Sequence, residues 1–306
     1  MDKMDNRTDK RAIPIIKLAG ICKLLTFALV TLQLTGCVKD DLYNTPHPDK
    51  GAVKITTDWS GASSDAILPQ SYVLRIGTLE QTVSGTSNAF NTLFEPGKQE
   101  LLVCHTAEGI TLNGNAATVN TRTDGTLEPM PGYLFSGAEE LAIVPDDTLK
   151  VTVKMQQRIR TLTLALGLNP GDEERIAGTS ATLTGIASSI DLKSGAITEG
   201  KNIVPAFTIG TNGAERTRAA GAPALTTTLR LLGVIPAEQQ VLTLNLTLTD
   251  GSTHTITTDL SEALKNFAEK MEPLELDTTL ELPVEAGVSA TITDWKEVDN
   301  GNIDIH

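Results

Sequence analysis

The stretch "LKVTVKMQQRIRTLTLALGL" (residues 149–168) decides the fold, because its apolar residues alternate with polar ones and the alternation changes phase. Apolar side chains occupy odd positions over 149–155 and even positions over 162–166. One continuous strand here would be about 66 Å long, whereas ordinary strands have five or six residues. A shift of one residue also reverses the buried face. We therefore predict two strands, the last of one domain and the first of the next, joined through "QQRIR" (156–160).

Similar short runs rich in Thr, Val, Ile and Leu continue on both sides, separated by Gly, Asn, Asp and Pro, and these are strand and turn signals. In the clearest run, 240–249, leucines alternate with Thr and Asn, which predicts one buried and one solvated face. Asp250-Gly251 follows it and predicts a hairpin. The expected strands are 52–59, 71–77, 99–107, 149–156, 160–166, 226–234, 240–249 and 253–260.

One segment has helical instead of strand periodicity, "DLSEALKNFAEKM" (259–271). Asp259 stands at the N-cap position and Glu262 completes a capping-box spacing. We predict a short helix packed on the second domain of an otherwise all-β protein. The chain length fits two domains, which we place at 51–156 and 157–306.

The front of the chain contains an apolar run between Lys23 and Cys37 that is preceded by several basic residues. As a helix this run would reach about 17 Å, too short for a hydrocarbon core of roughly 30 Å. A basic segment, a short apolar segment and small residues before a cysteine are typical of a secretory signal. We predict a signal peptide over residues 1–36.

The tetrad "LTGC" resembles the lipobox of bacterial lipoproteins, and the alternative is an ordinary signal peptide with an incidental cysteine. The resemblance implies that the thiol of Cys37 is acylated and that Cys37 becomes the first residue of the mature chain. The polar, proline-containing residues 37–50 then form a flexible tether. The other lipobox residues are Leu34, Thr35 and Gly36.

The chain is acidic, with 25 Lys and Arg against 38 Asp and Glu. Residues 1–36 hold six basic and three acidic side chains, so the remaining chain has a net charge near −16. Nucleic acids and anionic membrane surfaces require a basic patch, so neither is an expected partner. Once Cys37 is acylated, Cys104 alone remains, so no intrachain disulfide is expected.

The sequence contains no recognisable catalytic or metal-binding motif. The four histidines lack metal-ligand spacing, and the acidic groups at 146–147 and 172–174 supply too few oxygens for calcium. His105 follows Cys104 in a predicted strand and is interpreted as a packed neighbour, not a catalytic partner. Carboxylates for glycoside hydrolysis could still meet in space. We predict no enzyme activity, no metal and no cofactor beyond the lipid on Cys37.

Six sequence blocks, spread in order over most of the chain after Cys37, carry a family resemblance. The blocks are "HPDKGAVKITTDWS", "LFEPGKQELLVCHTAEGITLNG", "QQRIRTLTLAL", "LRLLGV", "DLSEALKNF" and "ATITDWKEVDNGN". Together they resemble the fimbrillin superfamily of type V pili, and are similar in particular to its FimB-like, anchor-type outer-membrane lipoproteins. The resemblance implies two tandem transthyretin-like β-sandwich domains, fimbrial subunits as partners, and assembly by strand addition. It also implies display at the cell surface outside the outer membrane.

Two further features follow from this resemblance. The residues Lys39, Asp40 and Asp41 resemble the surface-export signal of such lipoproteins. Polymerising pilins of the superfamily are cleaved after an arginine near the first strand, but no arginine occurs here between Cys37 and Arg75. The lipid would be kept, which favours an anchor over a shaft subunit.

The sequence therefore supports a surface lipoprotein that anchors a fimbria or is an accessory subunit of one. The alternative is a stand-alone adhesin or glycan-binding lipoprotein that binds glycans or proteins on host or bacterial surfaces. Four aromatic residues could line a sugar site, although such residues in a sandwich are more often core plugs. These residues are Trp59, Tyr72, Tyr133 and Trp295. Lysine-specific cleavage at Lys39 or Lys50 also remains open.

Overall fold

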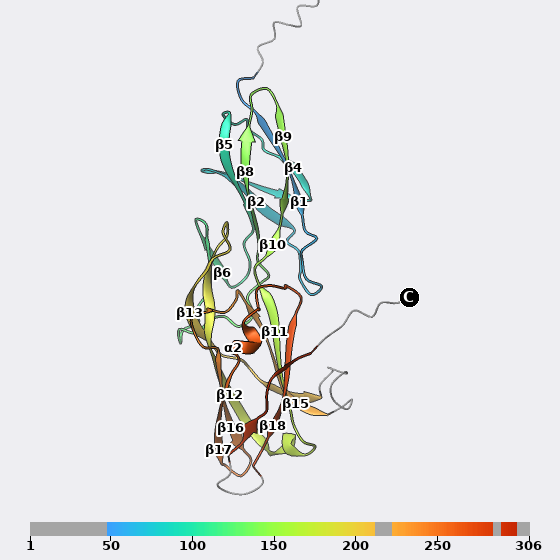
Figure 1. Ribbon diagram of the computed structural model, residues 1–306, viewed down its shortest axis with the longest axis vertical. Helices are drawn as coiled ribbons and strands as arrows, with labels where there is room; N and C mark the ends of the chain where they lie inside the picture. Colours follow the sequence, from blue (N-terminus) through green and yellow to red (C-terminus); the bar gives the residue numbers. More distant parts are fainter. Residues whose placement is uncertain (1–47, 212–221, 284–288, 299–306) are drawn as a thin grey trace, which may run out of the picture. The chain divides into compact units, whose positions relative to one another are not determined.

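The fold is described by a computed structural model for residues 48–211, 222–283 and 289–298 (Figure 1). Nearly all regular structure in these ranges is β-strand, arranged in four sheets. The sheets form two β-sandwiches in tandem, so the all-β fold is confirmed. Their buried apolar side chains form one continuous cluster.

The first sandwich pairs a small sheet with a larger one. In the small sheet, β1 (Ala52–Asp58) lies between β4 (Ser87–Ala89) and β9 (Thr148–Lys154), antiparallel to β4 and parallel to β9. The larger sheet is antiparallel and has the order β10-β8-β5-β2-β3. Its strands are β2 (Ser71–Ile76), β3 (Leu79–Ser84), β5 (Gly97–Cys104), β8 (Phe135–Ile143) and β10 (Gln156–Gln157).

The second sandwich consists of two six-stranded sheets. One contains β14 (Thr208–Thr211), β15 (Pro223–Leu231), β11 (Arg160–Gly167), β18 (Leu274–Glu281), β19 (Thr291–Ile292) and β20 (Lys296–Glu297). The other contains β17 (Thr253–Asp259), β16 (Val241–Leu248), β12 (Ile176–Asp191), β13 (Ile197–Ile203), β7 (Ala116–Val119) and β6 (Ile110–Asn113). A short 3₁₀ helix, Asp172–Arg175, precedes β12.

All eight strands expected from alternation are present, with small shifts at their ends. The phase change within 149–168 marks the passage from β9 in the first sandwich to β11 in the second. β11 lies between β15 and β18 and is buried on nearly every residue, as a central strand should be. The Asp250-Gly251 hairpin joins β16 to β17, and Gly251 has the left-handed φ of 84° that such a turn requires.

The helix is much shorter than the expected 259–271. α2 spans Ser261–Leu264 only, and turns follow it. At its start, the Asp259 carboxylate accepts hydrogen bonds from the backbone N and Oγ of Ser261. At its end, the carbonyl of Phe267 accepts from Arg160 Nη1 at 2.8 Å. This carbonyl is therefore paired with a side chain from β11 instead of with a further helical turn.

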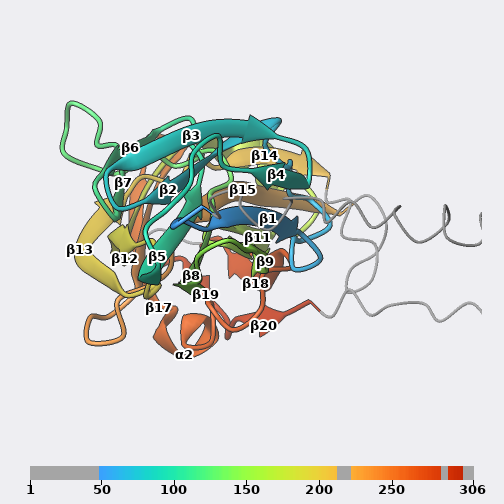
Figure 2. The same cartoon turned by 90° about the horizontal axis from the view of Figure 1, so that it is seen from above.

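One hairpin crosses the expected division of the chain at residue 156. Residues 110–119 fall within the stretch assigned to the first sandwich, but β7 pairs with β12 of the second sandwich, with Thr118 opposite Ser189. Figure 2 shows β6 and β7 beside β12. The first half of the chain thus contributes two strands to a sheet of the second sandwich.

Candidate functional site: a free sheet edge and the joint between the sandwiches

On one side of the first sandwich, each of the two sheets has a strand whose outer edge is free. β9 is the last strand of its sheet and has no partner on its outer edge among the described residues. The outer edge of β8 is also free along 137–143, because β10 pairs only with Phe135 and Ser136, while the other edge of β8 pairs with β5. The two strands contact each other, as Figure 1 shows, without forming a ladder. We call this side of the sandwich the β8/β9 edge.

The β8/β9 edge is tightly closed at one end and less covered at the other. At Gly137, an added Cβ would lie 2.6 Å from Val153 Cγ1 and 2.8 Å from the Lys154 carbonyl oxygen. Val153 is accordingly buried. Toward the start of β9, Leu149 and Val151 are only half-buried although they point to the same interior. An apolar row therefore runs along β9 with its outer part incompletely covered.

The free backbone groups of β9 can be assigned from its pairing with β1. The amide of Ala52 donates to the Asp147 carbonyl at 2.9 Å. Because hydrogen-bonding direction alternates along a strand, the odd-numbered residues of β9 bond to β1. The even-numbered residues Lys150 and Thr152 direct their N–H and C=O groups to the free edge. The C=O of Thr148 points the same way, but its N–H already donates to Asp147 Oδ1 at 2.6 Å. Such groups can pair with a further strand.

The opposite side of the first sandwich is closed by a side chain. Gln81 of β3 donates through Nε2 to the Ala89 carbonyl at 3.0 Å and accepts from the Asn91 amide at 2.9 Å. These bonds join the edge strands β3 and β4 of the two sheets. The β8/β9 edge has no comparable bridge in the residues that the structure describes, so it is the more open side.

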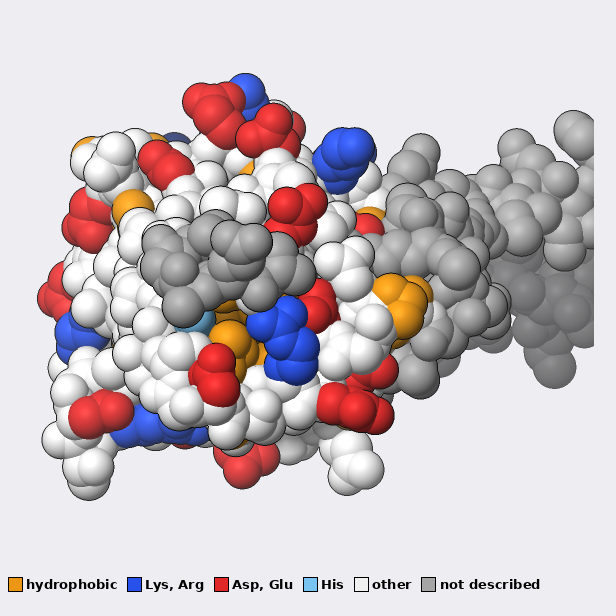
Figure 3. Space-filling view, turned by 90° about the horizontal axis from the view of Figure 1, so that it is seen from below, with side chains coloured by type: hydrophobic (Ala, Val, Ile, Leu, Met, Phe, Trp, Pro, Cys, Tyr) orange, Lys and Arg blue, Asp and Glu red, His pale blue; other side chains and the backbone are white. Residues whose placement is uncertain are grey.

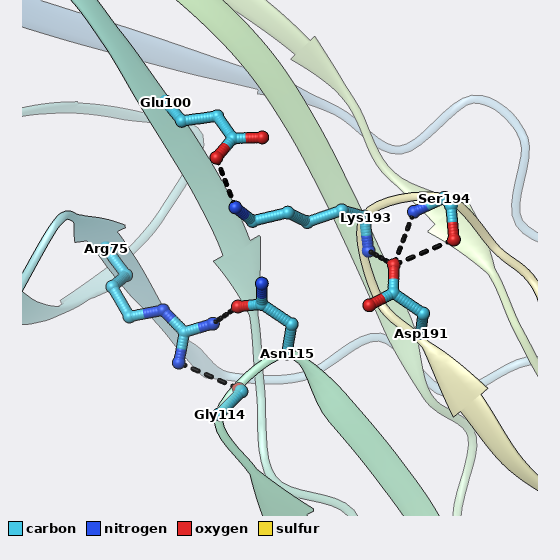
Figure 4. A network of polar contacts seen from close by, with 7 residues as sticks. All are labelled: Arg75, Glu100, Gly114, Asn115, Asp191, Lys193 and Ser194. Atoms are coloured by element: carbon cyan, nitrogen blue, oxygen red, sulfur yellow. Dashed lines mark hydrogen bonds and ion pairs between the residues drawn. The ribbon is translucent and has the colours of Figure 1, made fainter.

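The joint between the sandwiches contains a polar network (Figure 4). Arg75 of β2 donates to the Gly114 carbonyl at 2.9 Å and to the Asn115 amide oxygen. Lys193, in the turn between β12 and β13, pairs with Glu100 of β5. Two turns of the second sandwich are thereby held against the outer face of the larger sheet of the first.

A loop of the first sandwich also reaches the second. The Asp65 carboxylate accepts hydrogen bonds from Ser63 Oγ and Thr161 Oγ1, each at 2.6 Å, and from the Tyr133 hydroxyl. Burial raises the pKa of Asp65, but the three hydroxyl donors outweigh it and hold the pKa below its usual value. Asp65 is therefore ionised when it joins the two sandwiches.

The linker arginines bind oxygens on both sides of the joint. Arg158 Nε donates to Ser136 Oγ at 2.8 Å, and its Nη2 lies 3.4 Å from the Leu192 carbonyl. Arg160 Nε donates to the Glu272 carbonyl at 2.5 Å. Burial lowers the pKa of both guanidinium groups. The segment "QQRIR" is thus a hydrogen-bonded joint, which the strand pattern alone did not indicate.

The Cys104–His105 pair is built into the core. His105 Nδ1 lies 2.8 Å from the Thr106 carbonyl, and Nε2 accepts from the Phe135 amide at 3.1 Å. Both ring nitrogens are therefore occupied by the backbone, and burial raises the pKa of the Cys104 thiol. This geometry fits a packed pair and leaves neither nitrogen to activate the thiol.

Of the four aromatic residues considered for a sugar site, only Trp59 and Tyr72 pack together among the described residues. Trp59 packs edge-on against Tyr72 and Phe135, with ring centroids 5.7 and 5.4 Å apart. Trp295 lies in the second sandwich and donates to Thr258 Oγ1 at 3.1 Å. Tyr133 is buried beneath the guanidinium of Arg230. The described residues also contain no group of three side chains suited to a metal ion.

The predicted lipidation and export residues lie outside the described residues. They are Leu34, Thr35, Gly36, Cys37, Lys39, Asp40 and Asp41. Within the described ranges, no helix has the length and apolarity needed to cross a membrane. The face in Figure 3 carries dispersed acidic side chains and smaller groups of basic ones.

Comparisons with known proteins place the chain in a family. Residues 70–301 match the family model described as fimbrillin-A associated anchor proteins Mfa1 and Mfa2. The comparison with curated proteins gave no match. Solved structures match over most of their length.

The fimbrial anchor protein Mfa2 from Porphyromonas gingivalis matches with a TM-score of 0.55 and 8% identity, over 81% of this chain and 97% of that one. A candidate adhesin from Bacteroides ovatus matches with a TM-score of 0.54 and 10% identity, over 87% and 98%. A candidate adhesin from Bacteroides thetaiotaomicron matches with a TM-score of 0.53 and 12% identity, over 82% of this chain and 98% of that one. These similarities show a shared fold. Because the family model matches about three quarters of this chain, the chain belongs to the family of fimbrillin-A associated anchor proteins.

Proposed function

We propose that this chain is a non-enzymatic anchor or accessory subunit of a fimbria, held at the outer-membrane surface by acyl chains on Cys37. We further propose that it joins a fimbrial subunit by strand addition at the β8/β9 edge. Family membership supports the fimbrial role. The observation that carries the proposed edge is the half-buried pair Leu149 and Val151 beside unpaired backbone groups of β9.

A strand laid along β9 would satisfy two needs of this edge. Its backbone would pair with the free N–H and C=O groups of Lys150 and Thr152 and with the C=O of Thr148, which supplies affinity. Alternate side chains would cover Leu149 and Val151, which sets the register. Lys150 and Lys154 are exposed on the same strand and disfavour indiscriminate pairing.

The position of β1 suits a chain pulled from its N-terminal side. β1 directly follows the proposed tether and is paired on both edges, with β4 and with β9 over seven residues. Tension from the lipid anchor would therefore enter the middle strand of a sheet and be shared by two ladders. The arginine and carboxylate contacts of the joint would carry it into the second sandwich.

The edge is tested by Thr152→Pro with Thr152→Ala as its matched control. Proline removes an N–H that faces the free edge, without removing a bond to β1, and edge strands tolerate it. We expect Thr152→Pro to fold but to lose co-purification of fimbrial subunits from cells, and Thr152→Ala to retain it. Equal recovery with both variants would rule out pairing along β9.

The fimbrial role is tested separately by deletion of the gene. Fimbriae of unchanged number, length and cell attachment in the deletion strain would refute it. A stand-alone adhesin is the alternative, because a shared fold does not assign a ligand. Binding to a glycan array that is lost on replacement of Trp59 or Trp295, with no fimbrial subunit recovered, would favour that alternative.

A further inference from the structure

A cavity of about 500 Å³ lies at the joint between the sandwiches, next to the end of the β8/β9 edge where β10 pairs with β8. It is bounded by the linker, by the turn between β12 and β13, and by the segment after α2. Its apolar lining includes the half-buried side chains of Ile197 and Met271 and the buried residues Met155, Ile190 and Leu232. This size and apolar lining are typical of a small-molecule site.

One polar group within this cavity has an unused donor. Two nitrogens of Arg158 are engaged, Nε with Ser136 and Nη2 with Leu192. Nη1 has no hydrogen-bond partner among the described residues. It lies beside Gly195, where an added Cβ would stand 2.7 Å from it. Gly195 has a φ of 74°, so glycine is suited both to the turn and to the space that Nη1 occupies.

The charge of Arg158 is also unmatched. It forms no ion pair with a carboxylate in the described part of the chain, and burial lowers its pKa. Asp191 opposes this shift at longer range, but its Oδ1 already accepts from Lys193 and Ser194. At the rim, the exposed Lys154 and Glu269 carry opposite charges. A half-buried cation without a counterion favours an anionic ligand.

We propose that this cavity binds a small amphiphile with an apolar body and one anionic oxygen group, such as a carboxylate or sulfonate. The apolar body contacts the half-buried side chains of Ile197 and Met271, and the anionic group accepts hydrogen bonds from Arg158 Nη1. The bound ligand bridges both sandwiches, because its lining comes from each of them. The proposal does not rest on the proposed fimbrial role, because its argument uses only the cavity lining and the contacts of Arg158.

The test uses two fluorescent probes with nearly the same ring system. One is 8-anilinonaphthalene-1-sulfonate, which is anionic, and the other is N-phenyl-1-naphthylamine, which is neutral. We expect the intact chain to bind both, and Arg158→Gln to weaken the anionic probe at least about tenfold while changing the neutral probe less than about twofold. Decanoate should displace the anionic probe from the intact chain.

Two further variants make the result specific. Ala268→Trp introduces a large side chain at an exposed position of the cavity lining and should weaken both probes. Arg122→Gln removes one positive charge elsewhere, from a pair with Glu128, and should change neither. The proposal is overturned if Arg158→Gln affects both probes equally, or if Ala268→Trp leaves the binding of both unchanged.

Discussion

Arg160 contacts Phe267 in two ways, because its Nη1 donates to the Phe267 carbonyl at 2.8 Å while the guanidinium lies 5.1 Å from the centroid of the Phe267 ring. The same arginine also binds the Glu272 carbonyl. One side chain at the start of β11 thus organises the segment after α2. The Phe267 carbonyl is thereby paired with a side chain, where a continuing helix would pair it with a backbone amide.

Arg160→Leu should therefore destabilise the chain strongly. It removes two charge-assisted hydrogen bonds from a buried position and leaves two carbonyls unpaired, and we expect a loss of about 3 kcal/mol in the free energy of unfolding. Urea unfolding measures this loss. Arg122→Gln, which breaks a more exposed ion pair, should cost less than about 1 kcal/mol. Similar costs for the two variants would contradict the role assigned to Arg160.

The close approach at Gly137 can be tested with a pair of glycine replacements. Gly137→Ala places a Cβ 2.6 Å from Val153 Cγ1 and should cost about 1 to 3 kcal/mol, because a well-packed interior resists added atoms. Gly178→Ala, in β12, meets nothing within 4 Å and should be neutral or slightly stabilising. Thermal unfolding of both variants compares them. A destabilised Gly178→Ala beside an unchanged Gly137→Ala would contradict the described packing.

Stability should depend on pH through His105. Burial lowers the pKa of His105 below its usual value of 6.5, an effect that the Thr106 hydrogen bond only partly offsets. The unfolded chain then binds more protons than the folded chain between these two pKa values. The contribution of neutral His105 to the free energy of unfolding is therefore complete above about pH 6.5. It is lost as the pH falls through the pKa that His105 has in the folded chain.

The measurement is urea unfolding at about pH 7.5 and about pH 5.5 for the intact chain and for His105→Gln. The intact chain should lose more stability between these conditions than the variant does. Although glutamine itself lowers stability by removing the bond to Phe135, only the difference between the two pH values tests the titration. An equal difference in both chains would exclude His105 as its source.

If Cys37 is lipidated, replacing it should change where the protein is found in the cell. Cys37→Ser should move the protein from the membrane fraction to the soluble fraction, because stable anchoring needs at least two acyl chains at about 0.8 kcal/mol per buried methylene. Cys104→Ala alters the other cysteine of the mature chain and should leave the protein with the membrane. Mass spectrometry of the mature N-terminus checks the modification itself, and full membrane retention of Cys37→Ser would count against it.

Local pattern predicted some strands and missed others for identifiable reasons. β16 shows strict alternation of leucines, so its two faces are evident from the sequence. β12 consists largely of Ala, Gly, Ser and Thr, and contains a register shift between Leu183 and Ile186. β8 begins with three buried residues, Phe135 to Gly137, and does not alternate. A strand made of small residues or interrupted by a bulge has no clear period of two.

The joint shows the same limit for side chains. Arg158 and Arg160 stand two residues apart in a linker, where charged side chains are ordinarily solvated. Their roles depend on carbonyls far along the chain, at Leu192, Phe267 and Glu272. The signal that could have raised suspicion is that two arginines of an acidic chain fall where the strand phase changes.

The sequence by itself determined the all-β class, the Asp250-Gly251 hairpin and the resemblance to a fimbrial family. These depend on residue order and local periodicity. Only the tertiary structure decided that β9 is an edge strand and that the β6–β7 hairpin joins the second sandwich. Leu149 and Val151 alternate as they would in any half-buried strand, and the number of neighbours that a strand has is set by residues distant in sequence. A free edge is therefore a property of pairing across the whole fold.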